Sequence, residues 1–255
     1  QSPANRYTNL WKAICLIQQT DRVLFNGHDL SAFVSCKVSR PIMPPVNATF
    51  ESIGGRDGEL FKSAHFGGYD LPVDVWLRSD ERRDAATVRH ALAKMLCADE
   101  PAPLFLPDDP TRFLLAIVSG ETDLGEITDK CPFTTITFHV CDPFYYGRKR
   151  RVEVSAGTFT INAGGDRPAH LKITAKPASS AAWFMRNVDT GEQVKLASSV
   201  TSTSTVRVDM ATEHATVNGS TAAVTLDSDF FTIDGRTKLQ LSSGTAVLEW
   251  WERWL

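Results

Sequence analysis

The sequence lacks the long apolar segments and the leader pattern of membrane and secreted proteins. Its longest apolar runs, such as Phe113–Val118, have the length of a strand, far below the roughly 20 residues that cross a bilayer. The start of the chain shows no basic region followed by an apolar one. With 42% hydrophobic and 22% charged residues over 255 positions, the composition is that of a globular protein. We therefore expect no membrane partner, and synthesis and folding inside a cell.

Cysteines are few, and their spacing shows no motif of paired cysteines. The chain has five cysteines, Cys15, Cys36, Cys97, Cys131 and Cys141, and no Cys-x-x-Cys. An odd, scattered set excludes a disulfide scaffold and a cysteine zinc site. We expect five free thiols that serve as small apolar fillers, in a protein made in a reducing cytoplasm.

Motifs of catalysis and metal binding are missing. The six histidines form no His-Glu-x-x-His, and no Gly-x-Ser-x-Gly presents a serine nucleophile. Gly54–Gly58 lacks the Gly-Lys-Ser/Thr ending of a phosphate loop and is interpreted as a hairpin turn. Asp227–Gly235 resembles part of a calcium loop, but its Gly is misplaced and the terminal Glu is absent. We predict no enzyme, no catalytic residue, no cofactor and no metal site, and the sequence assigns no binding residues.

Charge is weak overall and unevenly placed. The net charge is −3, whereas general nucleic-acid binders are strongly basic. Residues 1–147 hold 14 basic and 19 acidic residues, or −5, and residues 148–255 hold 13 and 11, or +2. The basic run Arg148–Arg151 begins where the net charge changes from negative to positive. We interpret it as a solvated joint between two domains rather than as a nucleic-acid patch.

The first part of the chain mixes strands with one helix. Leu10, Ile14 and Ile17 have helical spacing and suggest an N-terminal arm. Strands are predicted at Arg22–Phe25, Ala48–Ile53, Asp70–Leu77, Phe113–Val118 and Thr134–Val140, and prolines exclude a helix at Ser39–Pro45. Ser79 or Asp80 is the expected N-cap of a helix. Its apolar stripe consists of Val88, Ala91, Leu92, Met95 and Leu96.

The second part predicts a β-sandwich. From Val152 to Trp251 short strands recur about every ten residues, separated by turn dipeptides such as Asn218-Gly219 and Ser243-Gly244. Val152–Val154 and Thr158–Ile161 are expected as separate strands, as are Lys238–Leu241 and Ala246–Trp251. The aromatic end Trp250–Leu255 is interpreted as a terminal strand that seals the sandwich or its interdomain contact. A lectin-like aromatic platform is the alternative.

An ordered series of motifs extends over residues 22–255. It runs through Phe25–Leu30, Ser39–Pro45, Gly55–Gly58, Val73–Leu77 and the helix near Asp80, then Leu104–Pro110, Ser119–Leu124, Thr135–Phe138, Asp142–Gly147, Asn162–Gly165 and Glu252–Leu255. In this order and spacing the chain resembles the siphophage distal tail protein family. The residues before about Arg22 extend beyond the usual start of that family.

The resemblance implies a mainly β fold with two domains. Residues 22–147 would be a ring-forming β-sandwich, the belt domain, with one α-helix and an extended hairpin arm. Residues 148–255 would be a galectin-like β-sandwich, and residues 1–21 an N-terminal arm of unknown role. Six copies would form a homohexameric ring through the first domain, and the second domain would project outward. A closed ring requires a heterologous interface whose rotation closes.

The resemblance also implies a place and partners. The protein would lie in the virion at the distal end of the tail, after assembly in the host cytoplasm. Its ring would join the tail tube protein to the tail tip or hub protein and serve as a hub for receptor-binding proteins in host adsorption. Genomic DNA would pass through the channel without specific binding, and an acidic first domain suits this because it repels phosphates. Two alternatives remain: a carbohydrate-binding module that contacts host glycans, and a wall-polymer hydrolase with paired carboxylates or a metal.

Overall fold

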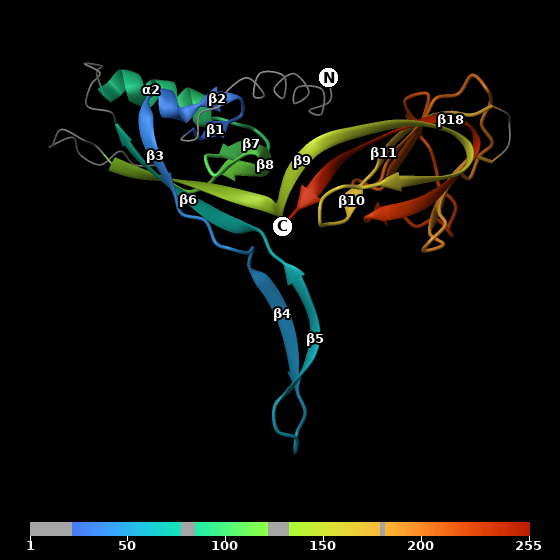
Figure 1. Cartoon of the computed structure of the whole chain (residues 1–255), viewed down its shortest axis with the longest axis horizontal. Helices are drawn as coiled ribbons and strands as arrows, with labels where there is room; N and C mark the ends of the chain where they lie inside the picture. The colour runs from blue at the N-terminus through green and yellow to red at the C-terminus, as the bar shows by residue number, and fades with distance from the viewer. Residues whose placement is uncertain (1–21, 78–84, 122–132, 179–181) are drawn as a thin grey trace. The chain divides into compact units, whose positions relative to one another are not determined.

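The chain folds into two compact units, Gln1–Tyr145 and Tyr146–Leu255 (Figure 1). The computed structural model describes residues 22–77, 85–121, 133–178 and 182–255. The expected N-terminal arm and the expected helix N-cap at Ser79 or Asp80 lie outside these residues. The long strand β9 (Phe133–Asn162) begins in the first unit and ends in the second. Each unit has its own hydrophobic core.

The first unit is built on one main sheet. Its strands follow the order β3–β6–β9–β8–β7–β1–β2, and β4 and β5 form a separate pair. The elements are β1 (Leu24–Phe25), β2 (His28–Asp29), the 3-10 helix η1 (Leu30–Ala32), β3 (Val34–Val38), β4 (Val46–Ser52), β5 (Glu59–Phe66), β6 (Tyr69–Leu77), α2 (Ala85–Leu96), β7 (Ala102–Leu106) and β8 (Asp109–Val118).

Alternation in β6 shows how the sequence sets the core of the first unit. Leu71, Val73 and Val75 are buried, because side chains two residues apart share one face of a strand. Asp74, between them, faces the other way and accepts a hydrogen bond from Thr135 Oγ1 of β9 at 2.8 Å. The stripe of α2 behaves as predicted, since Val88 and Leu92 are buried in the same core. No helix in the described part of the chain is long and apolar enough to cross a membrane.

The second unit consists of short strands and two long ones. The order β16–β15–β14–β11–β18–β9 forms its larger part, β12 joins β13 to β18, and β10 pairs with β17. Besides β9, the strands are β10 (Ala169–His170), β11 (Lys172–Lys176), β12 (Phe184–Asn187), β13 (Gln193–Lys195), β14 (Val206–Asp209), β15 (His214–Val217), β16 (Ser220–Thr221), β17 (Thr232–Ile233) and β18 (Arg236–Trp254). The predicted fold class, mainly β with an α-helix and a hairpin, is confirmed.

Two predicted strand breaks are wrong. Residues 152–161 continue without interruption inside β9, and Ser243-Gly244 lies inside β18 rather than in a turn. Gly244 has φ +76°, and a Cβ there would overlap the carbonyl oxygen of Lys176 and lie 2.7 Å from Pro177 Cα. Before Gly244 the strand pairs with β12, and after it with β11. The glycine therefore permits a close backbone approach where one strand changes partners.

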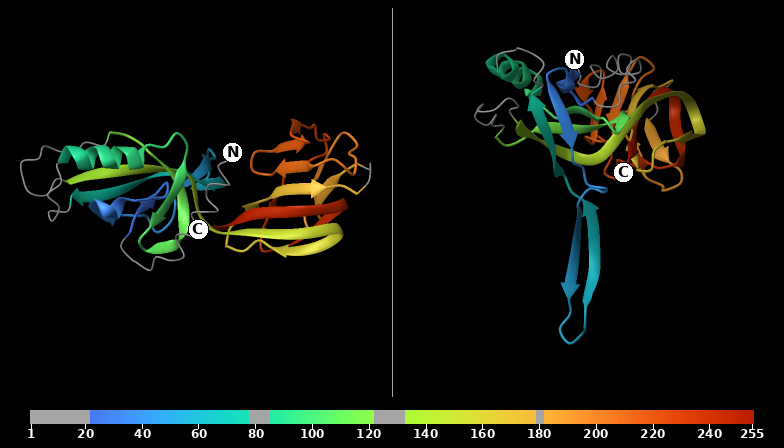
Figure 2. Two further views of the ribbon diagram at one scale, coloured as in Figure 1. Left: turned by 90° about the horizontal axis from the view of Figure 1, so that it is seen from above. Right: turned by 60° about the vertical axis from the view of Figure 1, so that its left-hand side comes forward.

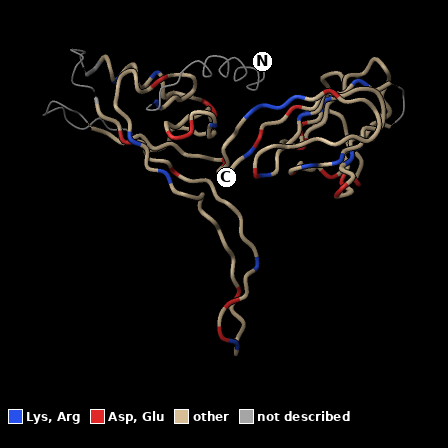
Figure 3. Tube along the Cα trace, in the orientation of Figure 1, with Lys and Arg blue, Asp and Glu red and all other residues tan. Residues whose placement is uncertain are grey.

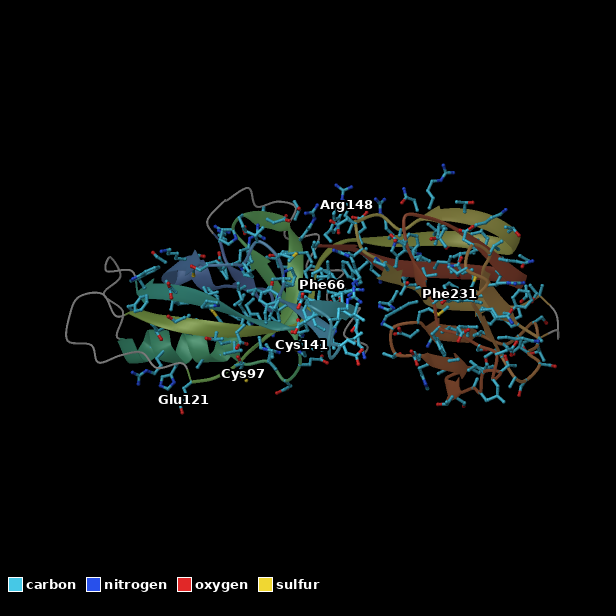
Figure 4. All side chains as sticks on the ribbon, turned by 90° about the horizontal axis from the view of Figure 1, so that it is seen from below. Phe66, Cys97, Glu121, Cys141, Arg148 and Phe231 are labelled. Atoms are coloured by element: carbon cyan, nitrogen blue, oxygen red, sulfur yellow. The ribbon has the colours of Figure 1, made fainter. Side chains whose placement is uncertain are left out.

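The interpretation of every cysteine as a buried filler is also wrong. Cys36, Cys97 and Cys141 are free thiols, but Cys97 and Cys141 are exposed (Figure 4). Val140 is buried, so its neighbour Cys141 occupies the opposite face of β9. Cys97 follows the last residue of α2. Of the cysteines that the structure describes, only Cys36, half-buried against the first core, matches the filler interpretation.

Candidate assembly surface

The β4–β5 hairpin, residues 46–66, is the most exposed element of the first unit and is named the arm. It extends well beyond the main sheet of its unit in Figure 1 and in the right-hand view of Figure 2. Its tip is the turn 53–58, where Gly55 and Gly58 have φ of +82° and +81°. Such angles are accessible to glycine at little cost. Gly54–Gly58 is thus a hairpin turn, as the sequence predicted, and not a phosphate-binding loop.

Apolar side chains are concentrated on and beside the arm. Every strand residue of the arm is exposed except Leu60 and Phe66, which are half-buried. Six of the eleven exposed large hydrophobic residues in the described part of the chain lie between residues 42 and 61. They are Ile42, Met43, Val46, Phe50, Ile53 and Phe61. Contiguous exposed apolar surface of this kind marks interaction sites.

The register of the hairpin collects apolar residues on one face. Val46 lies opposite Phe66, Ala48 opposite Ala64, and Phe50 opposite Phe61. Directly opposed residues share a face of an antiparallel pair. The six side chains of these three pairs therefore form the apolar arm face. The polar arm face carries Asn47, Thr49, Glu51, Ser63 and His65, together with Leu60.

A β-bulge keeps the apolar arm face continuous. The register shifts between Thr49 and Phe50, so that Lys62 is the extra residue of β5. Without the bulge, strict alternation would turn Phe61 to the polar face. With it, the rings of Phe50 and Phe61 meet edge to face with centroids 6.0 Å apart. Lys62 Nζ contacts Glu51 Oε2 at 2.8 Å. An isolated two-stranded hairpin is at best marginally stable in water, so this face is suited to burial against another surface.

The basic run Arg148–Arg151 begins three residues after the end of the first unit, and Arg148, Arg150 and Arg151 are exposed. All four residues lie in β9, whose basic segment runs beside β18 in the trace of Figure 3. Three of the four side chains contact acidic side chains of β18. Lys149 Nζ contacts Glu249 Oε1 at 3.1 Å. Arg150 Nε donates to Glu252 Oε1 at 2.7 Å, and Nη2 of the same guanidinium lies at 2.6 Å from that oxygen. The run therefore fastens β9 to β18 within the second unit.

Glu252 makes the most buried of these contacts between β9 and β18, since its side chain is only 8% exposed. Its Oε2 accepts from the backbone N–H of Arg148 at 3.3 Å. A Cβ at Gly147 would lie 3.1 Å from Oε2, and one at Gly164 would lie 2.7 Å from Oε1. Two glycines thus leave the space that the carboxylate occupies. A buried carboxylate in this setting requires its positive partner.

We expect Glu252→Gln to destabilise the second unit. The loss of the charge-assisted bonds to Arg150 is expected to cost about 2 kcal/mol, less than for a fully buried pair because Arg150 is half-exposed. The matched control is Glu249→Gln, on the same strand and more exposed, which is expected to cost about 0.5 kcal/mol. Urea unfolding followed by tryptophan fluorescence measures both. Equal losses in the two variants would contradict the central role of Glu252.

The aromatic end of the chain lies in β18, as the terminal-strand interpretation predicted. Trp250 is 3% exposed, and its Nε1 donates to the carbonyl oxygen of Ala163 at 2.7 Å. Arg253 Nη1 donates to the Pro168 carbonyl oxygen at 3.1 Å, and the Leu255 N–H donates to Asp166 at 2.8 Å. The Trp250 ring, buried in the second core, is not available as part of a sugar platform.

The segment that resembles a calcium loop is occupied by internal hydrogen bonds. Asp227 accepts from Gln193 Nε2 at 3.1 Å, and hydrogen bonds from Thr225, its own backbone and Gln193 hold the pKa of its carboxyl below the ordinary value. The Asp234 N–H donates to Thr237 Oγ1 at 3.1 Å. Among the described residues, no three His, Cys, Asp or Glu side chains are grouped closely enough to hold a metal ion.

Two family models match the chain. One describes a phage tail protein RIFT-related domain and matches residues 25–140, and the other describes a siphovirus-type tail component C-terminal domain and matches residues 164–254. The chain belongs to the siphophage distal tail protein family. It is thus a structural protein of a phage tail, and its place is in the virion.

Solved structures of related fold agree with the family. The distal tail (Dit) protein of phage SPP1, described as a paradigm of the hub adsorption apparatus in phages that infect Gram-positive bacteria, is 18% identical with a TM-score of 0.76, over 92% of this chain and 99% of that one. Chains of the phage p2 baseplate in its activated conformation, solved with Ca and with Sr, are 8% identical with TM-scores of 0.52, over 88% of this chain and 92% of theirs. No curated protein matches the sequence significantly.

Proposed function

We propose that six copies of this distal tail protein form a ring that joins the tail tube to the baseplate or tip, and that the apolar arm face makes the contact between neighbours. The observation that supports this proposal is the amphipathic arm, because covering its exposed phenylalanines with a neighbouring copy would stabilise the assembly. Burial of one such side chain contributes about 1.5–3 kcal/mol. The likeness to the SPP1 hub protein supports the same role.

The form of the arm favours a ring over a two-fold dimer. A narrow hairpin that extends from one copy meets a different surface on the next, which is a heterologous contact. Such contacts close into a ring when the rotation between neighbours fits, and six copies correspond to a rotation of about 60° per copy. Negative-stain electron microscopy of concentrated protein is expected to show rings with six-fold symmetry. Open filaments or unassembled particles would contradict the proposed closure.

The ring would act as a hub at the distal end of the tail, and it would assemble in the host cytoplasm. We propose the tail tube protein and the tail tip or hub protein as its direct neighbours, with receptor-binding proteins attached around it. Genomic DNA would pass through the channel without specific binding. The acidic balance of residues 1–147, −5 from 14 basic and 19 acidic residues, supports this because negative walls repel phosphates.

We further propose that residues 22–147 form the ring and that residues 148–255 are a separable, galectin-like module that projects outward. Residues 1–21 would be an N-terminal arm of unknown role, distinct from the hairpin arm. The separate hydrophobic cores of the two units support this division. A chain that ends at Gly147 is expected to fold and to assemble, and the 148–255 fragment is expected to fold as a monomer. Solution masses of both fragments test this. Fragments that become soluble only when mixed would show that the two halves form one folding unit.

A further inference from the structure

Three elements of the first unit converge at the root of the arm. Arg40 lies in the loop 39–45 that leads from β3 into the arm, and it reaches two residues far along the chain. Its Nη1 donates to the Tyr145 hydroxyl of β9 at 2.7 Å. Its Nη2 contacts Asp108 Oδ2, in the turn between β7 and β8, at 2.5 Å. We call Arg40, Asp108 and Tyr145 the root clamp.

The other strand of the arm is held at the same place. The Gly67 N–H donates to the Pro45 carbonyl oxygen at 2.9 Å and closes the base of the hairpin. Phe66, labelled in Figure 4, meets Phe144 of β9 edge to face, with ring centroids 5.6 Å apart. A Cβ at Gly68 would lie 2.9 Å from the Val140 carbonyl oxygen. The loop that leads into β4 and the last residue of β5 therefore contact β9 at adjacent residues, Tyr145 and Phe144.

The root clamp differs from an ordinary surface ion pair. Arg40 also lies over the Tyr145 ring, 5.6 Å from its centroid, so one guanidinium combines a carboxylate contact, a hydroxyl contact and a cation–π contact. Burial lowers the pKa of Arg40, but the Tyr145 hydroxyl and the Asp108 and Asp109 carboxylates outweigh it and raise the pKa above its ordinary value. The guanidinium is therefore charged at any pH the protein meets.

The direction of the arm depends on contacts at its root. The loop 39–45 has no secondary structure beyond a bend. In the described part of the chain, no strand of the main sheet pairs with the arm, and most of its residues are exposed. Contacts at the root therefore set the direction in which the hairpin leaves the sheet. Their effect is multiplied at the tip, because a small rotation at the base displaces the tip most.

We propose that the root clamp sets the direction of the arm and that Arg40 is a positioning residue for assembly rather than part of the interface. The effect on assembly rests on the proposed ring. An arm already held in its bound direction loses less conformational entropy when a neighbour covers it, which strengthens association without any new contact. In the absence of the clamp the arm samples many directions, and this entropy is lost at each interface.

Arm direction is measurable without any ring. Spin labels on Asp57→Cys at the tip and on native Cys141, with the other four cysteines replaced and Phe61→Glu added to prevent association, report the distance between tip and β9. A narrow distance distribution is expected, and a clearly broader one after Arg40→Ala. Identical distributions would overturn the proposal. Arg40→Lys is expected to remain broad, because one ammonium cannot contact Asp108 and Tyr145 together.

Assembly supplies the second readout. In otherwise native protein, Arg40→Ala is expected to weaken association at least about tenfold by sedimentation, which corresponds to about 1.4 kcal/mol, with an unchanged melting temperature for the dissociated chain. Arg22→Ala removes an ion pair of the same unit that lies outside the arm, Arg22 Nε to Asp29 Oδ2 at 3.3 Å, and is the control expected to associate as the native chain does. Native association by Arg40→Ala would overturn the positioning role. If the native chain forms no ring, the proposed function fails, while the spin-label distances still decide the clamp.

Discussion

Phe61→Glu is expected to abolish assembly while the chain remains folded. Phe61 is 63% exposed, so the substitution removes no core contact and is expected to change the unfolding free energy by less than about 0.5 kcal/mol. At a covered interface the same change removes an aromatic anchor and buries an unpaired carboxylate. The association constant between neighbours is expected to fall at least about 100-fold. Sedimentation velocity and thermal unfolding on the same samples separate the two effects.

Ser63→Glu is the matched control for Phe61→Glu. It introduces the same charge into the same strand two positions away, and the bulge at Lys62 places it on the polar arm face, opposite Thr49. We expect near-native association. Equal loss of assembly in both variants would show that any negative charge on the arm is harmful. Native assembly by Phe61→Glu would remove the apolar arm face from the interface.

Gly244→Ala is expected to destabilise the second unit strongly, although it adds only one methyl group. The residue has φ +76°, which an L-amino acid adopts at a cost of about 1 kcal/mol. In addition, the new Cβ would overlap the backbone at Lys176 and Pro177, which cannot rotate away. We expect a total of about 3 kcal/mol or more and a fall in melting temperature of about 15 °C for a unit of this size. Calorimetry of the full chain measures it.

Gly219→Ala separates the two causes. Gly219 has φ +87°, and a Cβ there would meet nothing within 4 Å. Gly219→Ala therefore adds backbone strain without a steric clash, and the free energy of unfolding is expected to fall by about 1 kcal/mol. Comparable losses at Gly219 and Gly244 would mean that β18 moves easily away from β11 at this point. The close approach would then not be required for the change of strand partners.

Local patterns in the sequence were sufficient to predict many elements. The alternation of Leu71, Val73 and Val75 predicted β6 and its buried face, and the stripe of Val88 and Leu92 predicted the buried side of α2. Both are periodic signals within one element. Gly54–Gly58 was interpreted correctly as a hairpin turn for a similar reason, because a glycine-rich segment between two strands contains its own conformational signal.

Long-range contacts could not be predicted in the same way. Glu252 bonds to Arg150 across 102 positions, and nothing near either residue identifies its partner. Ser243-Gly244 is predicted as a turn but lies inside β18, because a positive φ suits a turn and a close backbone approach equally well. The bulge at Lys62 depends on the pairing of two strands and not on either strand alone. Consequently the apolar arm face, although Val46, Ala48 and Phe50 alternate visibly, was recognised only in the structure.

The molar mass of the native chain in solution tests the central claim most directly. Light scattering coupled to size exclusion, at increasing concentration, is expected to show a species of about 169 kDa, six times 28.1 kDa, that dissociates toward monomers on dilution. The apolar arm face predicts that this species is absent in Phe61→Glu and present in Ser63→Glu. A native chain that remains monomeric or dimeric at high concentration would contradict the proposed ring.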